Sequence, residues 1–178
     1  KQDPSLPIIS LKPGDDDGDS SMKRGEERRS TRRCRFDELQ PVFISAVRGF
    51  IKSKKPAELE SKIRNCYETT YMKKGFFGVF IYHQYTGMVI TPDWFFWGIS
   101  DGEDIFAGCI KMKDIAKIPD YEKILMSNPI EMRGIDISGF HYNESQHGSW
   151  SLYTGNDKAG EDFRQELAEA VRKYSIQH

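Results

Sequence analysis

The chain has 178 residues, of which 38% are hydrophobic and 30% charged, and its formal net charge is −1. This length and composition suit one soluble domain with a sizeable core and a tail. No apolar run approaches the roughly 20 residues that a membrane-spanning helix needs, and the opening Lys-Gln-Asp-Pro is not followed by an apolar leader. Three widely spaced cysteines favour reduced thiols, and we expect a cytoplasmic protein.

The first 35 residues differ in composition from the rest. An acidic run from Asp15 to Asp19 precedes seven basic residues between Lys23 and Arg35. Such a segment buries too little apolar surface to offset the entropy lost on ordering it. We therefore expect residues 1–35 to be a disordered charged tail and residues 36–178 to be a single folded domain.

Residues 36–70 are predicted to form a helical hairpin. The first helix has apolar residues at helical spacing, namely Leu39, Phe43, Val47, Phe50 and Ile51. Pro56 suits the first position of a second helix. The apolar face of that second helix would be Leu59, Ile63, Cys66 and Tyr67.

Residues 71–155 are predicted to be antiparallel strands. The segment is rich in β-branched and aromatic residues, and Ser100 to Asp104 (SDGED) is a hairpin turn signal. Residues 135–140 and 149–154 alternate between apolar and polar side chains. Such alternation is typical of strands with one buried and one solvated face.

Residues 157–175 are predicted to form a C-terminal helix. Asp157 is a suitable N-cap, and Arg172 and Lys173 suit the negative end of the helix dipole. The helix has one apolar stripe, formed by Phe163, Leu167, Ala170, Val171 and Tyr174. A single stripe of this kind must be buried against the strands that precede it.

The order of motifs from Gly87 to Val171 resembles the pleckstrin-homology-like fold, particularly bacterial PH-like and GRAM-type domains. The matching features are GMVITPDWFFW at 87–97, KMKDI at 111–115, and a strand, polar loop and helix over 150–174. The resemblance implies an α+β fold with a bent antiparallel sheet or partly open barrel and a C-terminal capping helix, here preceded by the helical hairpin. It also implies an open sheet edge suited to a protein or peptide partner.

No catalytic, cofactor or metal signature is present in the sequence. His141 and His147 flank a polar loop with Glu144, but a six-residue gap is not a recognised ligand spacing. Gly18 lies too early in the run Asp15 to Asp19 for an EF-hand loop. We therefore predict a protein that is not an enzyme and has no catalytic, cofactor-binding or metal-binding residues.

The strand around residues 94–97 (WFFW) is apolar on both faces. Trp94 and Phe96 share one face, and Phe95 and Trp97 share the other. The core covers one face. The second is covered by the N-terminal helices or by a partner or apolar ligand, so Trp94 and Phe96 are candidates for a partner surface.

The sequence favours a non-enzymatic interaction module that binds a protein or peptide. The main alternative is a peripheral membrane adaptor that binds anionic lipid through Lys52, Lys54, Lys55, Lys73 and Lys74. An enzyme whose active site is not visible in sequence is the remaining alternative. Nucleic acid is disfavoured as a partner, because no aromatic residue accompanies the basic run before Phe36.

Overall fold

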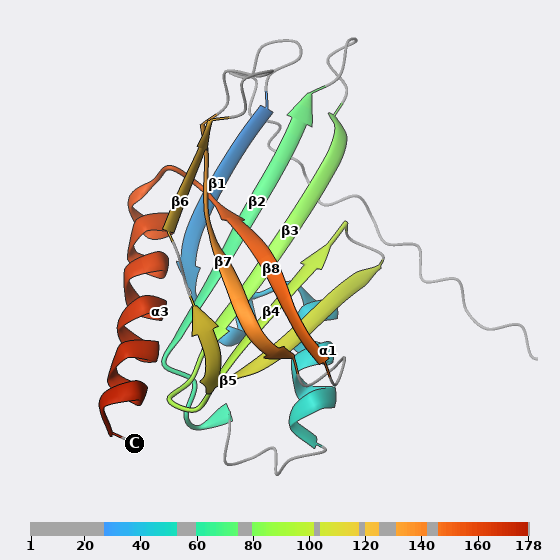
Figure 1. Cartoon of the computed structure of the whole chain (residues 1–178). Coiled ribbons are helices and arrows are strands. Elements are labelled where there is room, and N and C mark those ends of the chain that lie inside the picture. Colours follow the sequence, from blue (N-terminus) through green and yellow to red (C-terminus); the bar gives the residue numbers. More distant parts are fainter. Residues whose placement is uncertain are drawn as a thin grey trace, which may run out of the picture.

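The structure is a computed structural model, and it describes residues 27–52, 60–74, 80–101, 104–117, 120–124, 131–141 and 146–177. In chain order the elements are β1 (Glu27–Cys34), the 3-10 turn η1 (Phe36–Glu38), α1 (Pro41–Lys52), β2 (Asn65–Lys74), β3 (Phe80–Ile90), β4 (Trp94–Ser100), β5 (Ile105–Lys117), β6 (Asp120–Ile124), β7 (Glu131–His141), β8 (Gln146–Thr154) and α3 (Lys158–Gln177). Figure 1 shows α3 and α1 on opposite sides of the sheet. An α+β fold with an antiparallel sheet and a C-terminal helix is confirmed.

The strands form one antiparallel sheet in the order β1-β2-β3-β4-β5-β7, with β6 and β8 also paired to β7. The register pairs Ser100 with Ile105, which confirms the hairpin predicted between β4 and β5. Ile135 of β7 pairs with Asp120 of β6 and with Leu152 of β8, so these two strands lie along opposite edges of β7. β5 and β6 therefore follow one another along the same edge.

The connection between β8 and α3 is hydrogen-bonded both to β1 and to the first turn of α3. Asp157 caps α3, because its Oδ1 accepts from the Gly160 amide at 2.8 Å. Its Oδ2 accepts from the Thr31 amide of β1 at 2.6 Å, and the Gly155 amide donates to Thr31 Oγ1 at 2.7 Å. The predicted N-cap is confirmed, and the same carboxylate joins the two ends of the sheet.

The boundary expected for the disordered tail is wrong at its C-terminal end, because residues 27–34 form β1. This strand is ordered by β2, with which it pairs from Glu27↔Lys73 to Cys34↔Cys66. Arg32 donates to Glu68 at 2.9 Å, and Arg29 lies over the Tyr71 ring at 4.9 Å. Residues 1–26 lie outside the described residues.

The predicted helical hairpin is not supported by the described residues, because its second helix does not extend as far as predicted. Its first helix is present as α1, but Cys66 and Tyr67, assigned to the second helix, lie in β2. They face opposite sides of the sheet, with Cys66 in the outer cluster beneath α1 and Tyr67 in the inner cluster beneath α3. Residues 53–59, which include Pro56, lie outside the described residues.

The inner face of the sheet is covered by α3, as its apolar stripe predicts. Phe163 and Leu167 are fully buried, and Ala170, Val171 and Tyr174 pack against the same cluster. The Phe163 ring meets the Tyr67 ring edge-on with a centroid separation of 5.4 Å. Contacts with β1, β2 and β5 hold the helix across the concave side of the sheet.

The outer face is covered by α1, which is seated by one aromatic side chain. Phe43 is 1% exposed and lies over Gly87 of β3 and Gly98 of β4. A Cβ atom at these two glycines would come within 2.3 Å and 2.4 Å of the Phe43 ring. Their lack of a side chain therefore sets how closely α1 approaches the sheet.

Neither α1 nor α3, nor any other helical part of the described chain, is long and apolar enough to cross a membrane.

Candidate functional site

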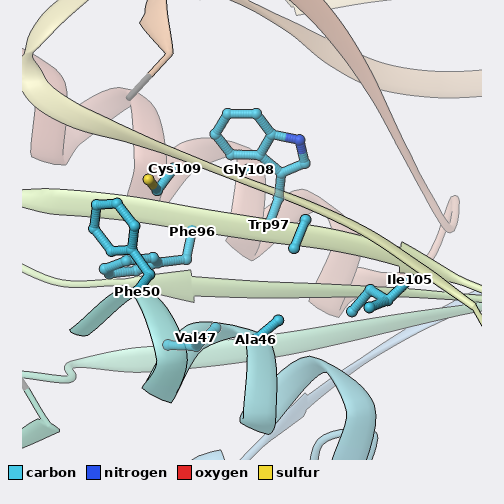
Figure 2. Close-up of a pocket in the computed structure, with 9 residues that line it drawn as sticks. Ala46, Val47, Phe50, Phe96, Trp97, Ile105, Gly108 and Cys109 are labelled. Atoms are coloured by element: carbon cyan, nitrogen blue, oxygen red, sulfur yellow. The ribbon is translucent and has the colours of Figure 1, made fainter. Parts of the chain in front are cut away.

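An apolar pocket lies along one flank of α1, between the helix and the outer face of β4 and β5. Its volume is about 310 Å³. Figure 2 shows Ala46, Val47 and Phe50 on the helix side and Phe96, Ile105 and Cys109 on the strand side. The helix and the sheet together therefore form the walls of one hollow.

Small residues create this hollow. Ala46 on α1 faces Ala107 and Gly108 on β5, so neither wall fills the space between the two backbones. Gly108 has a second role, because a Cβ there would come within 2.3 Å of the Trp97 ring. The indole of Trp97 lies on the side of the sheet away from α1, although its backbone adjoins the pocket (Figure 2).

The walls of the pocket suit an apolar group. None of the nine lining residues has an ionisable side chain except Cys109, which is 2% exposed. Small-molecule sites usually add a few convergent polar groups that fix the ligand's orientation, and this lining supplies none from its exposed side chains. The arrangement can bury an apolar side chain but offers no acid, base or metal ligand.

The two aromatic residues predicted as a partner surface lie beneath α1. Trp94 is 7% exposed and Phe96 is 2% exposed. The Phe50 ring of α1 meets them edge-on, with centroids 5.3 Å from Trp94 and 5.6 Å from Phe96. The chain's own helix therefore covers this face. Phe96 nevertheless forms part of one wall of the pocket.

A second hollow, which we call the arginine cleft, lies on the other flank of α1. Its volume is about 590 Å³, and four arginines line it, namely Arg33, Arg35, Arg48 and Arg64. Asp37 and Glu60 are the acidic residues of the lining. The cleft is therefore a concave, positively charged surface.

Acidic neighbours hold three of these guanidinium groups in place. Arg48 Nε donates to Glu60 Oε1 at 2.8 Å, Arg35 Nε donates to Asp37 Oδ1 at 3.1 Å, and Arg33 Nη1 lies 3.4 Å from Glu166 Oε1. The Asp37 carboxylate raises the pKa of Arg35, and Arg35 in turn lowers the pKa of Asp37. Each arginine retains further donors for an anion.

Of the five lysines predicted to contact lipid, the three that the structure describes belong to two different elements. Lys73 and Lys74 end β2, whereas Lys52 ends α1, and Figure 1 shows these ends at opposite extremes of the sheet. Lys73 Nζ lies 2.6 Å from Glu27 Oε1, in a pair that lowers the Glu27 pKa. Lys54 and Lys55 lie outside the described residues.

The two histidines considered as metal ligands have different surroundings, and two of the thiols are buried or half-buried. His141 is fully buried against the Trp97 ring, whereas His147 is exposed and lies next to Phe140. Burial raises the pKa of Cys34 to about 11 and that of Cys66 to about 12, so both thiols are protonated at neutral pH. In the described part of the chain, no three His, Cys, Asp or Glu side chains are placed to hold a metal ion.

Comparison of the chain with protein-family models, with curated proteins and with solved structures finds no match.

Sequence reasoning missed both hollows for the same reason. The pocket needs Ala46 of α1 opposite Ala107 of β5, and these residues are 61 positions apart in the printed sequence. The cleft needs β1, which was expected to be tail. The pair Ala107-Gly108 within an otherwise bulky strand was the one local signal for the pocket, because small residues in a strand often mark a close approach of another element.

Proposed function

We propose that this protein is a non-enzymatic interaction module that binds a protein or peptide by taking one of its apolar side chains into the pocket between α1 and β5. The observation that carries the proposal is the pocket itself, an open apolar hollow beside α1. Binding energy at interfaces is concentrated in a few apolar or aromatic side chains that enter such pockets.

The size and lining of the pocket support a peptide side chain over a polar small molecule. A volume of about 310 Å³ holds one large side chain and part of a neighbour. Specificity for a small polar ligand needs convergent hydrogen-bonding groups, whereas a peptide is also held by its backbone and flanking residues. Arg48, on the other flank of α1, is a charged group that such flanking residues can contact.

The proposal includes a pleckstrin-homology-like fold. Supporting features are the antiparallel sheet, the helix that follows its last strand, and the motif order between Gly87 and Val171. Interaction modules of this architecture bind ligands at loops and edges as well as on their faces, and the fold does not choose among these. The proposed function therefore rests on the pocket and not on the fold.

The direct test is selection from a random peptide library displayed on phage, using the purified full chain as bait. We expect enriched peptides to share one bulky apolar residue, and we expect Ala107→Phe, which fills the pocket, to weaken their binding at least tenfold. Ala168→Phe, the same change on the exposed face of α3, is the matched control and should leave binding unchanged. Equal binding to the wild type and Ala107→Phe proteins would reject the pocket as the docking site.

The arginine cleft favours a second candidate function, the binding of an anionic lipid headgroup. Four arginines on one concave surface provide the donors that phosphate prefers. Sedimentation with anionic vesicles should carry the protein down at low salt and less at high salt. Arg64→Gln should reduce that binding, while Arg172→Gln on the exposed side of α3 should not. Binding that is absent, or unaffected by salt, would reject this candidate.

A further inference from the structure

Two of the three cysteines face each other across neighbouring strands. Cys34 of β1 and Cys66 of β2 are direct partners in the antiparallel register. Both belong to the outer apolar cluster, so their side chains lie on the same face of the sheet. Both thiols are free in this structure.

Antiparallel pairing places such residues within the range that a disulfide needs. Directly opposed residues have Cα atoms about 4.5 to 5.5 Å apart, according to the type of pair. Disulfides join residues whose Cα atoms are about 4.4 to 6.8 Å apart, with Cβ atoms about 3.5 to 4.5 Å apart. Opposed residues have Cβ atoms about 4.5 to 5.5 Å apart, and closer in non-hydrogen-bonded pairs. Side-chain rotation and a small approach of the two strands therefore bring the sulfurs together.

The pair is also open to small reagents. Cys34 is half-buried, and both cysteines line the arginine cleft. Cys109 lines the apolar pocket instead and has Phe96, not a cysteine, opposite it on β4. It is separated from Cys66 by β3 and β4, since the register runs from Cys66 to Val89, Phe96 and Cys109. Three strand spacings amount to about 14 Å, which excludes a bond to Cys66 without rearrangement.

We propose that Cys34 and Cys66 form a redox modification site that a low-molecular-weight disulfide such as oxidised glutathione converts into an intramolecular disulfide. The Cys34 thiolate attacks one sulfur of oxidised glutathione, which forms a mixed disulfide and releases one glutathione thiolate. The Cys66 thiolate then attacks the Cys34 sulfur and releases the second glutathione. Two protons leave the cysteine thiols and end on the two glutathiones, so one disulfide is reduced for each one formed.

The burial that raises the pKa of each thiol sets the pH dependence of this exchange. Thiolate is the reacting species, so below about pH 11 the first step should accelerate roughly tenfold per pH unit. The reaction is thus slow at neutral pH and favoured by alkaline conditions. The ring closed by the bond contains η1 and α1, so oxidation ties the helix that walls both hollows to the sheet.

The experiment treats the full chain with oxidised glutathione at pH 8.5 and follows intact mass and non-reducing peptide maps. We expect the loss of two hydrogens, a fall from three free thiols to one, and a peptide pair that joins Cys34 to Cys66. The thermal midpoint should rise by several degrees on oxidation and fall back with dithiothreitol.

Three variants make the result decisive. Cys66→Ser should stop at the glutathione adduct on Cys34, and Cys109→Ser should oxidise at the wild-type rate. If Cys66→Ser is not folded by circular dichroism, the wild-type peptide map and Cys34→Ser decide instead. Cys34→Ser should form no intramolecular disulfide. A stable adduct on the wild-type protein, a bond that involves Cys109, or no bond under these conditions would overturn the proposal. The outcome is independent of the peptide-binding function proposed above.

Discussion

The helix α3 covers much more of the inner face of the sheet than α1 covers of the outer face. On the inner face, α3 contributes an uninterrupted apolar stripe and seals a core that includes Tyr67, Phe95 and Ile137. On the outer face, α1 is shorter and is seated chiefly by Phe43, which leaves the apolar pocket on one flank and the arginine cleft on the other.

We expect the face under α3 to determine stability and the face beside α1 to determine recognition. A closed core tolerates few changes, because interiors are packed as densely as organic crystals. A partly covered face retains accessible apolar surface, which is the property of a docking site. We therefore expect substitutions under α3 to affect folding, and substitutions beside α1 to affect binding.

The largest effect is expected from Phe163→Ala beneath α3. The side chain is fully buried and contacts the Tyr67 and Phe95 rings, so its removal leaves a cavity. The free energy of unfolding should fall by about 4 kcal/mol in urea denaturation. A loss below about 1 kcal/mol would show that α3 does not seal the inner face.

A smaller effect is expected from Gly98→Ala on the outer face. The new Cβ atom lies 2.4 Å from the Phe43 ring and forces α1 away from the sheet. We expect a loss of about 2 kcal/mol. Phe43→Leu should recover part of that loss in the double variant. Full additivity of the two changes would contradict a direct clash.

Asp157→Ala tests the connection between β8, β1 and α3. It removes the cap on Gly160 and the acceptor for the Thr31 amide, and it should lower the free energy of unfolding by about 1 to 2 kcal/mol. Asp162→Ala is the control, because Asp162 pairs with the exposed Lys158 in the same helix and, within the described residues, makes no hydrogen bond to β1. The control should change stability by less than about 0.5 kcal/mol.

The smallest effect is expected from the ion pair between Glu27 at the start of β1 and Lys73 near the end of β2. The Lys73 hydrogen bond lowers the Glu27 pKa below 4.5, the value for the free side chain. A lowered pKa gives stability that is present above 4.5 and is lost as pH falls through the folded-state value. Compared with Glu27→Gln, the wild type should lose under about 1 kcal/mol more between pH 6 and pH 3, because Lys73 is 49% exposed.

Elements with one strong apolar periodicity were predictable from the sequence. The C-terminal helix, its stripe and its cap at Asp157 follow from local rules, because the cap and the apolar residues at helical spacing lie in one continuous stretch of sequence. The hairpin between β4 and β5 follows from its turn residues. α1 was also predictable, since Phe43, Val47 and Ile51 repeat at helical spacing.

The N-terminal strands were not predictable, because long-range pairing decides them. β1 has the sequence ERRSTRRC, which carries no apolar periodicity and gains its order from cross-strand partners on β2. At the start of β2, the four-residue spacing between Ile63, which precedes the strand, and Tyr67 imitated a helix. The Thr69-Thr70-Tyr71 run favours a strand. With one strand taken as tail and the other as helix, neither the arginine cleft nor the Cys34–Cys66 pair was visible.

We expect recognition to take place beside α1. The most direct test is a titration of the ¹⁵N-labelled full chain with a phage-selected peptide, followed by amide chemical shifts. We predict that the largest changes fall at Ala46, Phe50 and Ala107, while Leu167 and its neighbours on α3 stay unchanged. Changes centred on α3, or at the end of the sheet near Lys73, would contradict it.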